Sequence, residues 1–307
     1  MPKNIRMEPA EFEEKEFEGP LYNELLLGSR RFATPGQVFE NAFGIDAALE
    51  AQHPIFWDRF GYRDIPDGIS LNHYRWGWVW RRHGGYRELP SFPVNLLIQS
   101  KRPDFLHGRR GDFADRGIAG HYWRFFTREH QQEMLERLVQ QLRHRALVVY
   151  ASPAFHTVRE LYQHTEAGTV SDHTSYVSPD RLANHSSWNY DTPGTTGIAA
   201  SEPEFVKEQA LEQRLEALGD QTGETDPLTD LEFFDDAVSA TVRDAEDNPY
   251  AEFFLSSEDR LLGFIRELGE VRKEVLKFTR VGRLYSMLGL NWLVTGKESS
   301  RLTRRHS

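Results

Sequence analysis

The feature that most constrains the fold is a short apolar segment between two prolines, Pro93 and Pro103. Leu96, Leu97 and Ile98 lie at its centre. A run this short, rich in branched side chains and bounded by prolines, predicts a buried β-strand rather than a helix. Proline has no N–H to donate and keeps the residue before it out of helical geometry, so the strand should end at about Lys101.

Polar residues occupy the last positions of this expected strand. Successive side chains of a strand point to opposite faces, so Gln99 and Lys101 should share one face, with Ile98 and Ser100 on the other. An amide and an ammonium at the end of a buried strand need a polar partner or a ligand. The strand end is therefore a candidate site.

The segments that follow favour a mixed sheet with covering helices. Apolar residues recur at helical spacing between Arg128 and Leu142, and a second apolar run from Ala146 to Ala151 predicts another strand. We expect a short helix from Val158 to His164 and a third strand from Thr174 to Val177. This order of elements predicts an α/β domain.

Upstream of the strand, one helix is marked clearly. Residues 1–33 are charged and predict an N-terminal arm with at most a short helix. Thr34 followed by a proline is a typical helix start, and Gly44 is a typical end. Asp46 then begins a short apolar run. Residues 50–92 are aromatic with interleaved arginines, for which base stacking and a local aromatic core both remain open.

Downstream, residues 186–201 are rich in Ser, Thr, Gly and Asn, which predicts a loop or linker. Beyond them the pattern predicts helices only, over 203–218, 231–245, 257–279 and about 281–294, and then a basic tail. The expected organisation is an N-terminal arm (1–33), an α/β domain with an insertion at about 50–92 (34–200) and a C-terminal helical region (201–307).

Charge is unevenly distributed along the chain, whose net charge is −10. From Arg59 to Arg124 there are 12 Lys/Arg and 6 Asp/Glu, whereas from Glu202 to Glu270 there are 5 and 20. The segment from Val271 onward is basic again, with 9 against 2. A basic segment around the candidate site can contact nucleic acid, and the alternative is that the acidic helices merely solvate a surface.

Several classes of function are disfavoured. The chain has no cysteine, which excludes disulfides, thiolate metal sites and a cysteine nucleophile. Its 12 histidines include no His-x3-His pair, and neither a phosphate-binding Gly-x4-Gly-Lys-Ser/Thr loop nor a Gly-x-Ser-x-Gly elbow is present. Without an apolar leader or a run near the ~20 residues of a membrane span, we expect a cytoplasmic location.

A helix with a glutamate, then Gly-x-Asp, then an apolar strand ending in Gln-x-Lys-Arg resembles the core of the PD-(D/E)xK nuclease superfamily. The Gln-x-Lys form is similar to that of Mrr-type restriction endonucleases. The residues that carry the resemblance are Glu40, Gly44, Asp46, Gln99, Lys101 and Arg102. It covers about residues 34–180 and includes the helix with Gln131 and Gln132 and the strand after it. The resemblance implies a restriction-endonuclease-like fold.

The resemblance also implies a magnesium- or manganese-dependent endonuclease that hydrolyses DNA, with a role in bacterial defence against foreign DNA. Asp46, Gln99 and the carbonyl of Ser100 would be metal ligands, Lys101 would hold water or stabilise charge, and Glu40 would complete the shell through water. This donor set suits the reaction, because magnesium prefers oxygen ligands, keeps several waters and activates one for hydrolysis.

Contact with DNA is expected from Arg102 and from Arg109 and Arg110 in a basic loop. The C-terminal helices would offer a surface for a protein partner, and an oligomer is compatible with the sequence. We expect no membrane association.

The chain departs from the family in the long separation between Asp46 and Gln99. The insertion at residues 50–92 would explain it, but Asp58, Asp64 or Asp67 could be the ligand instead of Asp46. A second function also stays open: a catalytically inactive nuclease-fold subunit that binds DNA or a protein partner in a larger defence or mobile-element complex.

Overall fold

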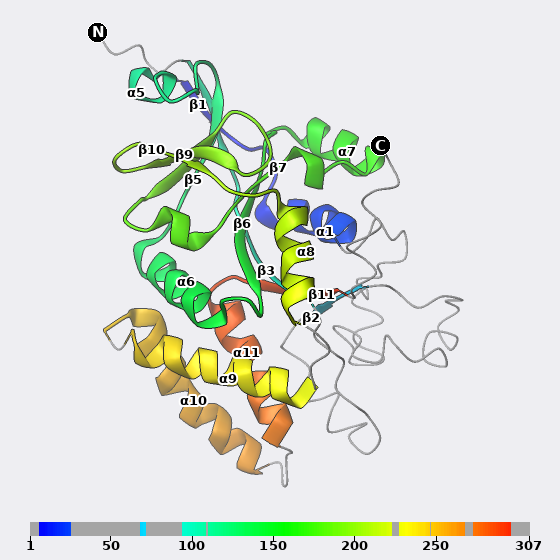
Figure 1. Ribbon diagram of the computed structural model, residues 1–307, viewed down its shortest axis with the longest axis vertical. Helices are drawn as coiled ribbons and strands as arrows, with labels where there is room; N and C mark the ends of the chain where they lie inside the picture. Colours follow the sequence, from blue (N-terminus) through cyan, green and yellow to red (C-terminus); the bar gives the residue numbers. More distant parts are fainter. Residues whose placement is uncertain are drawn as a thin grey trace.

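The computed structural model of the protein has a mixed α/β architecture with two β-sheets and covering helices (Figure 1). None of the helices in the described part of the chain is long and apolar enough to span a membrane. The structure describes residues 6–25, 68–71, 94–108, 110–222, 227–245, 247–267 and 273–295.

The sheet that carries the candidate site has five strands in the order β2-β11-β3-β6-β7. β3 pairs in parallel with β6, and the other neighbours are antiparallel. All seven residues of β3 are buried, which confirms the prediction for the segment between the prolines. The strands are β2 (Gly68–Leu71), β11 (Asn291–Thr295), β3 (Val94–Ser100), β6 (Leu147–Pro153) and β7 (Thr174–Val177).

The two faces of this sheet pack against different helices. Leu97 points into a core shared with α6 (Glu129–Leu142), whereas Leu96 and Ile98 point into a second core on the opposite face. That opposite face is covered by α1 (Glu14–Leu25), α7 (Val158–Ala167) and α8 (Leu211–Thr222). The helix and strand predicted over 128–142 and 146–151 are confirmed as α6 and β6, and β6 runs two residues further.

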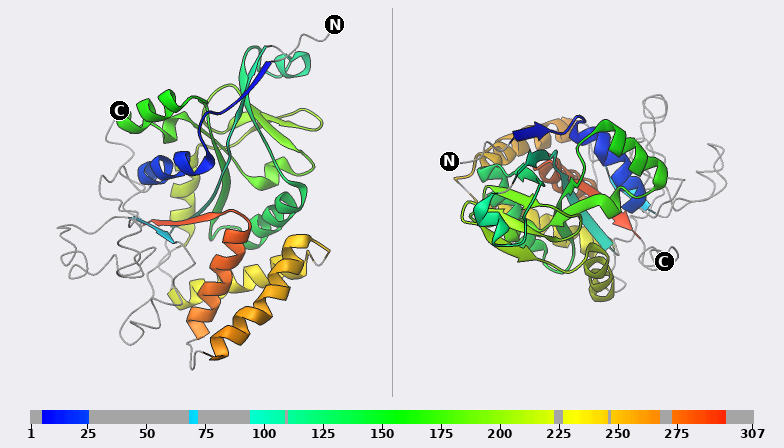
Figure 2. Two further views of the ribbon diagram at one scale, coloured as in Figure 1. Left: turned by 180° about the vertical axis from the view of Figure 1, so that it is seen from behind. Right: turned by 90° about the horizontal axis from the view of Figure 1, so that it is seen from above.

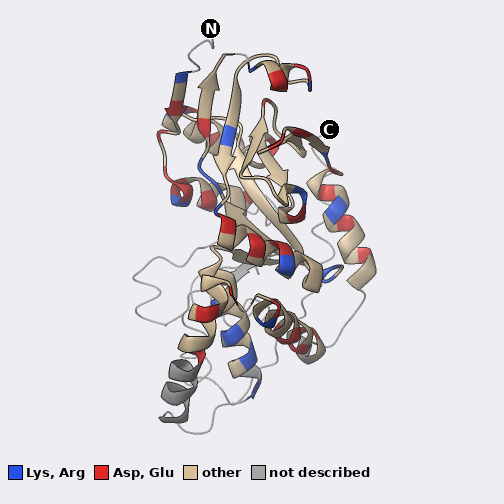
Figure 3. Cartoon of the chain, turned by 90° about the vertical axis from the view of Figure 1, so that its left-hand side faces the viewer, with Lys and Arg blue, Asp and Glu red and all other residues tan. Residues whose placement is uncertain are grey.

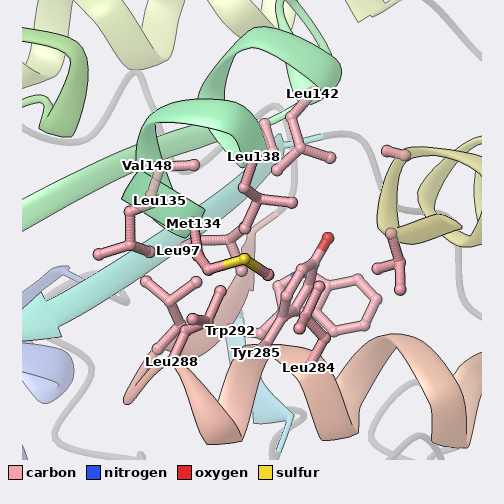
Figure 4. Packing of buried hydrophobic residues seen from close by; sticks show 14 of the residues in the cluster. Leu97, Met134, Leu135, Leu138, Leu142, Val148, Leu284, Tyr285, Leu288 and Trp292 are labelled. Atoms are coloured by element: carbon pink, nitrogen blue, oxygen red, sulfur yellow. The ribbon is translucent and has the colours of Figure 1, made fainter. Parts of the chain in front are cut away.

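The core around Leu97 also takes in the C-terminal helices (Figure 4). α9 (Pro227–Arg243), α10 (Pro249–Glu267) and α11 (Lys273–Met287) pack beside α6, and β11 brings Trp292 into the same cluster. The Trp292 ring lies 5.6 Å from that of Phe278 and 5.4 Å from that of Tyr285. The C-terminal helices therefore belong to the core that supports β3.

Three acidic residues of α9 and α10 pair with basic residues of α11. Figure 3 shows how the charged residues are distributed over the chain. Arg280 contacts Asp235 at 2.8 Å and also bonds to Glu258, and Lys277 contacts Glu232 at 2.8 Å. The opposite charges of the two C-terminal segments are thus placed together by the packing of α11 on α9 and α10.

The second sheet is antiparallel and has six strands in the order β1-β4-β5-β8-β9-β10 (Figure 2). A short helix, α5 (Gly111–Ala114), covers part of one face with Phe113. The strands are β1 (Arg6–Pro9), β4 (Asp104–His107), β5 (Tyr122–Phe126), β8 (Ser187–Tyr190), β9 (Thr196–Ala200) and β10 (Glu204–Lys207). Two short 3-10 helices, η2 (Ser171–His173) and η3 (Pro179–Leu182), complete the described elements.

The prediction of an irregular N-terminal arm is wrong for the described residues 6–25. β1 pairs with β4, and α1 runs for twelve residues with Phe17 and Leu21 buried against the sheet. Tertiary pairing overrides a strongly charged local sequence here.

The prediction of a loop or linker over 186–201 is also wrong, because β8 and β9 form a hairpin there. Trp188 and Ile198 are fully buried on this hairpin. The side chain of Asn189 donates to the carbonyl of Ile198 at 3.0 Å. Polar strand residues that bond across the hairpin resemble a loop in sequence.

The C-terminal region is not purely helical, in contrast to the prediction. β10 and β11 are strands, and β11 lies between β2 and β3 in the main sheet. The helices predicted over 257–279 and 281–294 are instead α10, α11 and β11. The helix predicted from Thr34 to Gly44 lies outside the described residues, as does most of the 50–92 insertion.

Candidate active site

Gln99 and Lys101 lie on the same side of β3, as the alternation of side chains predicted. The side chain of Gln99 donates a hydrogen bond to the carbonyl of Leu288, and Lys101 lies over the ring of Tyr150. Leu288 and Tyr150 both belong to the core that α6 shares with this face of the sheet. Gln99 is 5% exposed and Lys101 9%. Two polar side chains are therefore buried together at the end of a central strand.

The amide of Gln99 is held by the turn that follows α11. Its Nε2 donates to the carbonyl of Leu288 at 2.8 Å, and Nε2 of Gln131 donates to the same oxygen at 2.9 Å. Gly289 follows with a φ of +69°, and a Cβ there would lie 3.0 Å from Nε2 of Gln99. The turn thus fixes the amide plane of Gln99 and needs glycine to do so.

The oxygen of the same amide has no partner. Oε1 of Gln99 is buried and accepts no hydrogen bond within the described part of the chain. A buried acceptor without a donor is uncommon, because its desolvation is not compensated. An amide oxygen in this state can accept a hydrogen bond or coordinate a cation.

Lys101 is similarly uncompensated. Its Nζ lies 5.3 Å from the centroid of the Tyr150 ring, and among the described residues it makes no hydrogen bond or ion pair. Burial lowers the pKa of Lys101 to about 8, while the charge of Glu14 raises this pKa and that of Arg128 lowers it. A cation at the face of an aromatic ring gains some stabilisation, but less than a carboxylate would supply.

The surroundings of Lys101 are rigid. Tyr150 donates its hydroxyl to Oε1 of Gln132 at 2.6 Å. Nε2 of Gln132 donates in turn to Glu136 and to the carbonyl of Pro179. Because this network satisfies every polar atom of the Gln132 amide, it holds the Tyr150 ring beneath Lys101.

Ser100 points to the other face, as predicted from its parity. Its hydroxyl lies 3.1 Å from the hydroxyl of Tyr22 on α1. The side chain of Ser100 is therefore structural, and only its main-chain carbonyl was predicted as a metal ligand.

The arginines expected to bind DNA have partners within the chain. The guanidinium of Arg102 donates to the carbonyl of Ala10 and to Glu13, the latter at 2.9 Å. Arg110 pairs with Asp112 at 2.8 Å and lies over the ring of Phe113. Arg109 lies outside the described residues. Arg102 and Arg110 are thus engaged in holding local structure.

Glu40 and Asp46 lie outside the described residues, as do Asp58, Asp64 and Asp67. Within the described ranges, no group of three or more histidine or acidic side chains is arranged to hold a metal ion. The described donors at the site are therefore the oxygen of Gln99 and the main chain of β3.

Sequence reasoning missed the parts of the site that come from far along the chain. Gln131 appeared only as a helix residue, and neither Leu288 nor Gly289 was linked to Gln99. One signal was present in the sequence: Gln131 and Gln132 precede Leu135 at helical spacing, on the apolar face of the helix. Polar residues on the buried face of a helix indicate a polar neighbour.

Comparison with known proteins adds no relative. No protein-family model, no curated protein and no solved structure matches this chain.

Proposed function

We propose that this protein is a metal-dependent endonuclease that hydrolyses phosphodiester bonds in DNA. One observation carries the proposal: on one side of the same strand end, Oε1 of Gln99 is buried and the side chain of Lys101 is largely buried, and neither Oε1 nor Nζ has a hydrogen-bond or ion-pair partner among the described residues. Uncompensated polar groups of this kind are retained where a ligand or substrate completes them.

The roles follow from the chemistry of the two groups. A divalent ion, when bound, would activate water and neutralise charge on the phosphate. Gln99 would present its free amide oxygen toward that ion, because its nitrogen is committed to Leu288. Lys101 would stabilise negative charge that develops on the phosphate oxygens, an effect that burial strengthens.

The described residues fit a magnesium or manganese site in part. Magnesium accepts few protein oxygens and keeps water ligands, and an amide oxygen suits it. A neutral amide alone binds such an ion weakly, so the site also needs carboxylates. Asp46, with Glu40 beside it, remains the proposed source of that charge, on the resemblance stated above.

A second candidate function is favoured by a different observation. The nitrogen of Gln99 is bonded to Leu288, which gives Gln99 a structural role that needs no metal. A nuclease-fold subunit that binds DNA or a protein without cutting would retain this contact. The alternative proposal is therefore an inactive subunit of this kind in a larger defence or mobile-element complex.

Nicking of supercoiled plasmid separates the two functions. The full-length protein is incubated with plasmid and magnesium or manganese, with a chelator in the matched sample, and RNA is offered in parallel. We expect metal-dependent nicking that is lost in Asp46→Asn and kept in Arg243→Gln, an exposed basic residue at the end of α9. DNA binding without nicking under any of these conditions would instead support the inactive subunit.

A further inference from the structure

The N-terminus of α6 carries free hydrogen-bond donors beside Lys101. The first helical hydrogen bond runs from the N–H of Gln132 to the carbonyl of Arg128. Arg128, the N-cap residue, is extended and supplies no side-chain cap. The N–H groups of Glu129, His130 and Gln131 therefore have no acceptor within the described part of the chain. Such groups favour an anion, as does the dipole of a 14-residue helix.

An independent observation points to the same place. Lys101 is nine-tenths buried, and its ammonium makes no hydrogen bond or ion pair among the described residues. It lies over Tyr150, whose hydroxyl is bonded to Gln132 in the first turn of α6. The geometry thus places an unpaired ammonium beside the start of the helix.

Most of the acidic groups near Lys101 and the start of α6 already have partners within the chain. Arg128 is exposed and close enough to repel Lys101. Of the acids nearby, Glu14 accepts the N–H of Arg102 and Glu133 pairs with Arg137. Glu129, in the first turn, is exposed. Two cations and three free N–H groups remain for an anionic ligand.

We propose that the start of α6, with Lys101 and Arg128, forms a binding site for a tetrahedral phosphate group. Both an inorganic phosphate and a phosphate of nucleic acid present this chemistry. The assignment to a DNA phosphate rests on the proposed function, whereas binding of phosphate itself does not.

The test is a titration of the full-length protein followed by backbone amide chemical shifts. The probes are inorganic phosphate and a dinucleoside monophosphate, each added with a chelator present and with chloride as the control at equal ionic strength. We expect saturable shifts centred on Glu129, His130 and Gln131. Shifts that chloride reproduces, or that spread over the surface, would mean no site and overturn the proposal.

A matched pair of variants isolates the N–H donors. Glu129→Pro and Glu129→Gln lose the same charge, but only the proline variant also loses an N–H. Proline is tolerated at the first helical position, and Arg128 already has the extended geometry that a following proline requires. We expect about tenfold weaker phosphate binding in Glu129→Pro than in Glu129→Gln. Equal affinities would overturn the role of the helix start.

The cations are tested by Lys101→Met and Arg128→Gln, with Arg243→Gln as the distant control. We expect about tenfold weaker binding in Lys101→Met and about threefold in Arg128→Gln, because the first cation is buried and the second exposed. Affinity that is unchanged in Lys101→Met, with its amide spectrum still folded, would contradict the proposal.

The two probes separate this inference from the proposed nuclease. Phosphate binding at α6 by a protein that never nicks DNA would retain the anion site and refute the nuclease. Nicking that persists in Glu129→Pro, with no phosphate-induced shifts at α6, would refute the anion site alone. Preference for the dinucleoside monophosphate over inorganic phosphate supports a nucleic-acid ligand, and the reverse preference overturns that assignment.

Discussion

The two sides of the sheet at the end of β3 bury polar groups in opposite ways. On the side toward α1, Ser100 bonds to Tyr22, and Arg102 bonds to Ala10 and Glu13. On the side toward α6, the oxygen of Gln99 and the ammonium of Lys101 have no such partners among the described residues. The residues of the two sides alternate over four consecutive positions, from Gln99 to Arg102.

The difference separates a structural role from a chemical one. Burying a polar group costs free energy unless a hydrogen bond compensates it. Ser100 and Arg102 on the α1 side are compensated, so these groups stabilise the attachment of α1 and the segment before it to the sheet. The α6 side is not, so its groups are expected to matter for ligand binding and catalysis more than for stability.

The largest stability effect is expected at Gly289, which shapes the α6 side. Its φ of +69° disfavours any side chain, and a Cβ would lie 3.0 Å from Gln99 and 3.6 Å from Gln131. We expect Gly289→Ala to lower the free energy of unfolding by about 1–3 kcal/mol, measured by urea denaturation. Gly120→Ala is the control, since nothing lies within 4 Å of that position. Equal stability of the two variants would show that the turn does not constrain the glutamines.

Gln99→Glu tests the same turn and the metal proposal together. The variant loses the N–H that Leu288 accepts and sets a carboxylate against that carbonyl. We expect a loss of about 1–2 kcal/mol of unfolding free energy, along with tighter binding of magnesium or manganese. Gln140→Glu, at an exposed position of the same helix as Gln131, is the charge control. Weaker metal binding by a folded Gln99→Glu protein would remove Gln99 from the ligand set.

Tyr22→Phe tests the α1 side. The variant deletes the hydroxyl that lies 3.1 Å from Ser100 and leaves the ring in place. We expect a loss of about 1 kcal/mol of stability with no change in cleavage rate or phosphate affinity. A double-mutant cycle with Ser100→Ala measures the pair directly. A lower cleavage rate in Tyr22→Phe would contradict a purely structural role for the α1 side.

The smallest effect is a pH dependence on the α1 side. His164 stacks on His173 at 3.8 Å, and burial, then the charge of His173, lowers the pKa of His164, while Glu160 opposes this shift. Asp172 and Glu24 lie close to each other and to His173.

Because the pKa of His164 is lowered in the folded state, His164 binds a proton more readily in the unfolded chain than in the folded one. The folded state is therefore fully stable with respect to His164 above about pH 6.5 and loses stability as the pH falls below it. We expect His164→Phe to reduce the loss between pH 7.5 and 5.5 by less than about 1 kcal/mol, since the ring is partly exposed. His144→Gln, an exposed control, should follow the wild type, and an identical pH profile for His164→Phe would exclude this contribution.

The parts of this fold that could be predicted from sequence are those with a strong local period. β3, α6 and β6 follow from apolar runs and helical spacing, and the shared side of Gln99 and Lys101 follows from the alternation of a strand. β8, β9 and β1 could not be predicted because they are short and rich in polar residues, and the strands that pair with them are not indicated by the local sequence. β11 is a five-residue strand whose partner β3 lies almost two hundred positions earlier.

The same distance limits what could be predicted of the site. The contact between Gln99 and Leu288 spans 189 residues and has no local signal. The long-range pairing of β11 with β3 also rules out a simple truncation of the C-terminal region. Deletion from Ser201 would remove β11 from the centre of the sheet and expose the core around Trp292, so it would unfold the protein rather than uncover a surface.

The central claim is that the uncompensated groups on the α6 side act in chemistry, and the nicking rate of Lys101→Met tests it most directly. Methionine has a similar length and replaces an unpaired buried charge, so the fold should persist. With magnesium and supercoiled plasmid, we predict a rate at least about 100-fold below that of the wild type, whereas Tyr22→Phe keeps the full rate. A folded Lys101→Met protein that nicks at the wild-type rate would contradict the account.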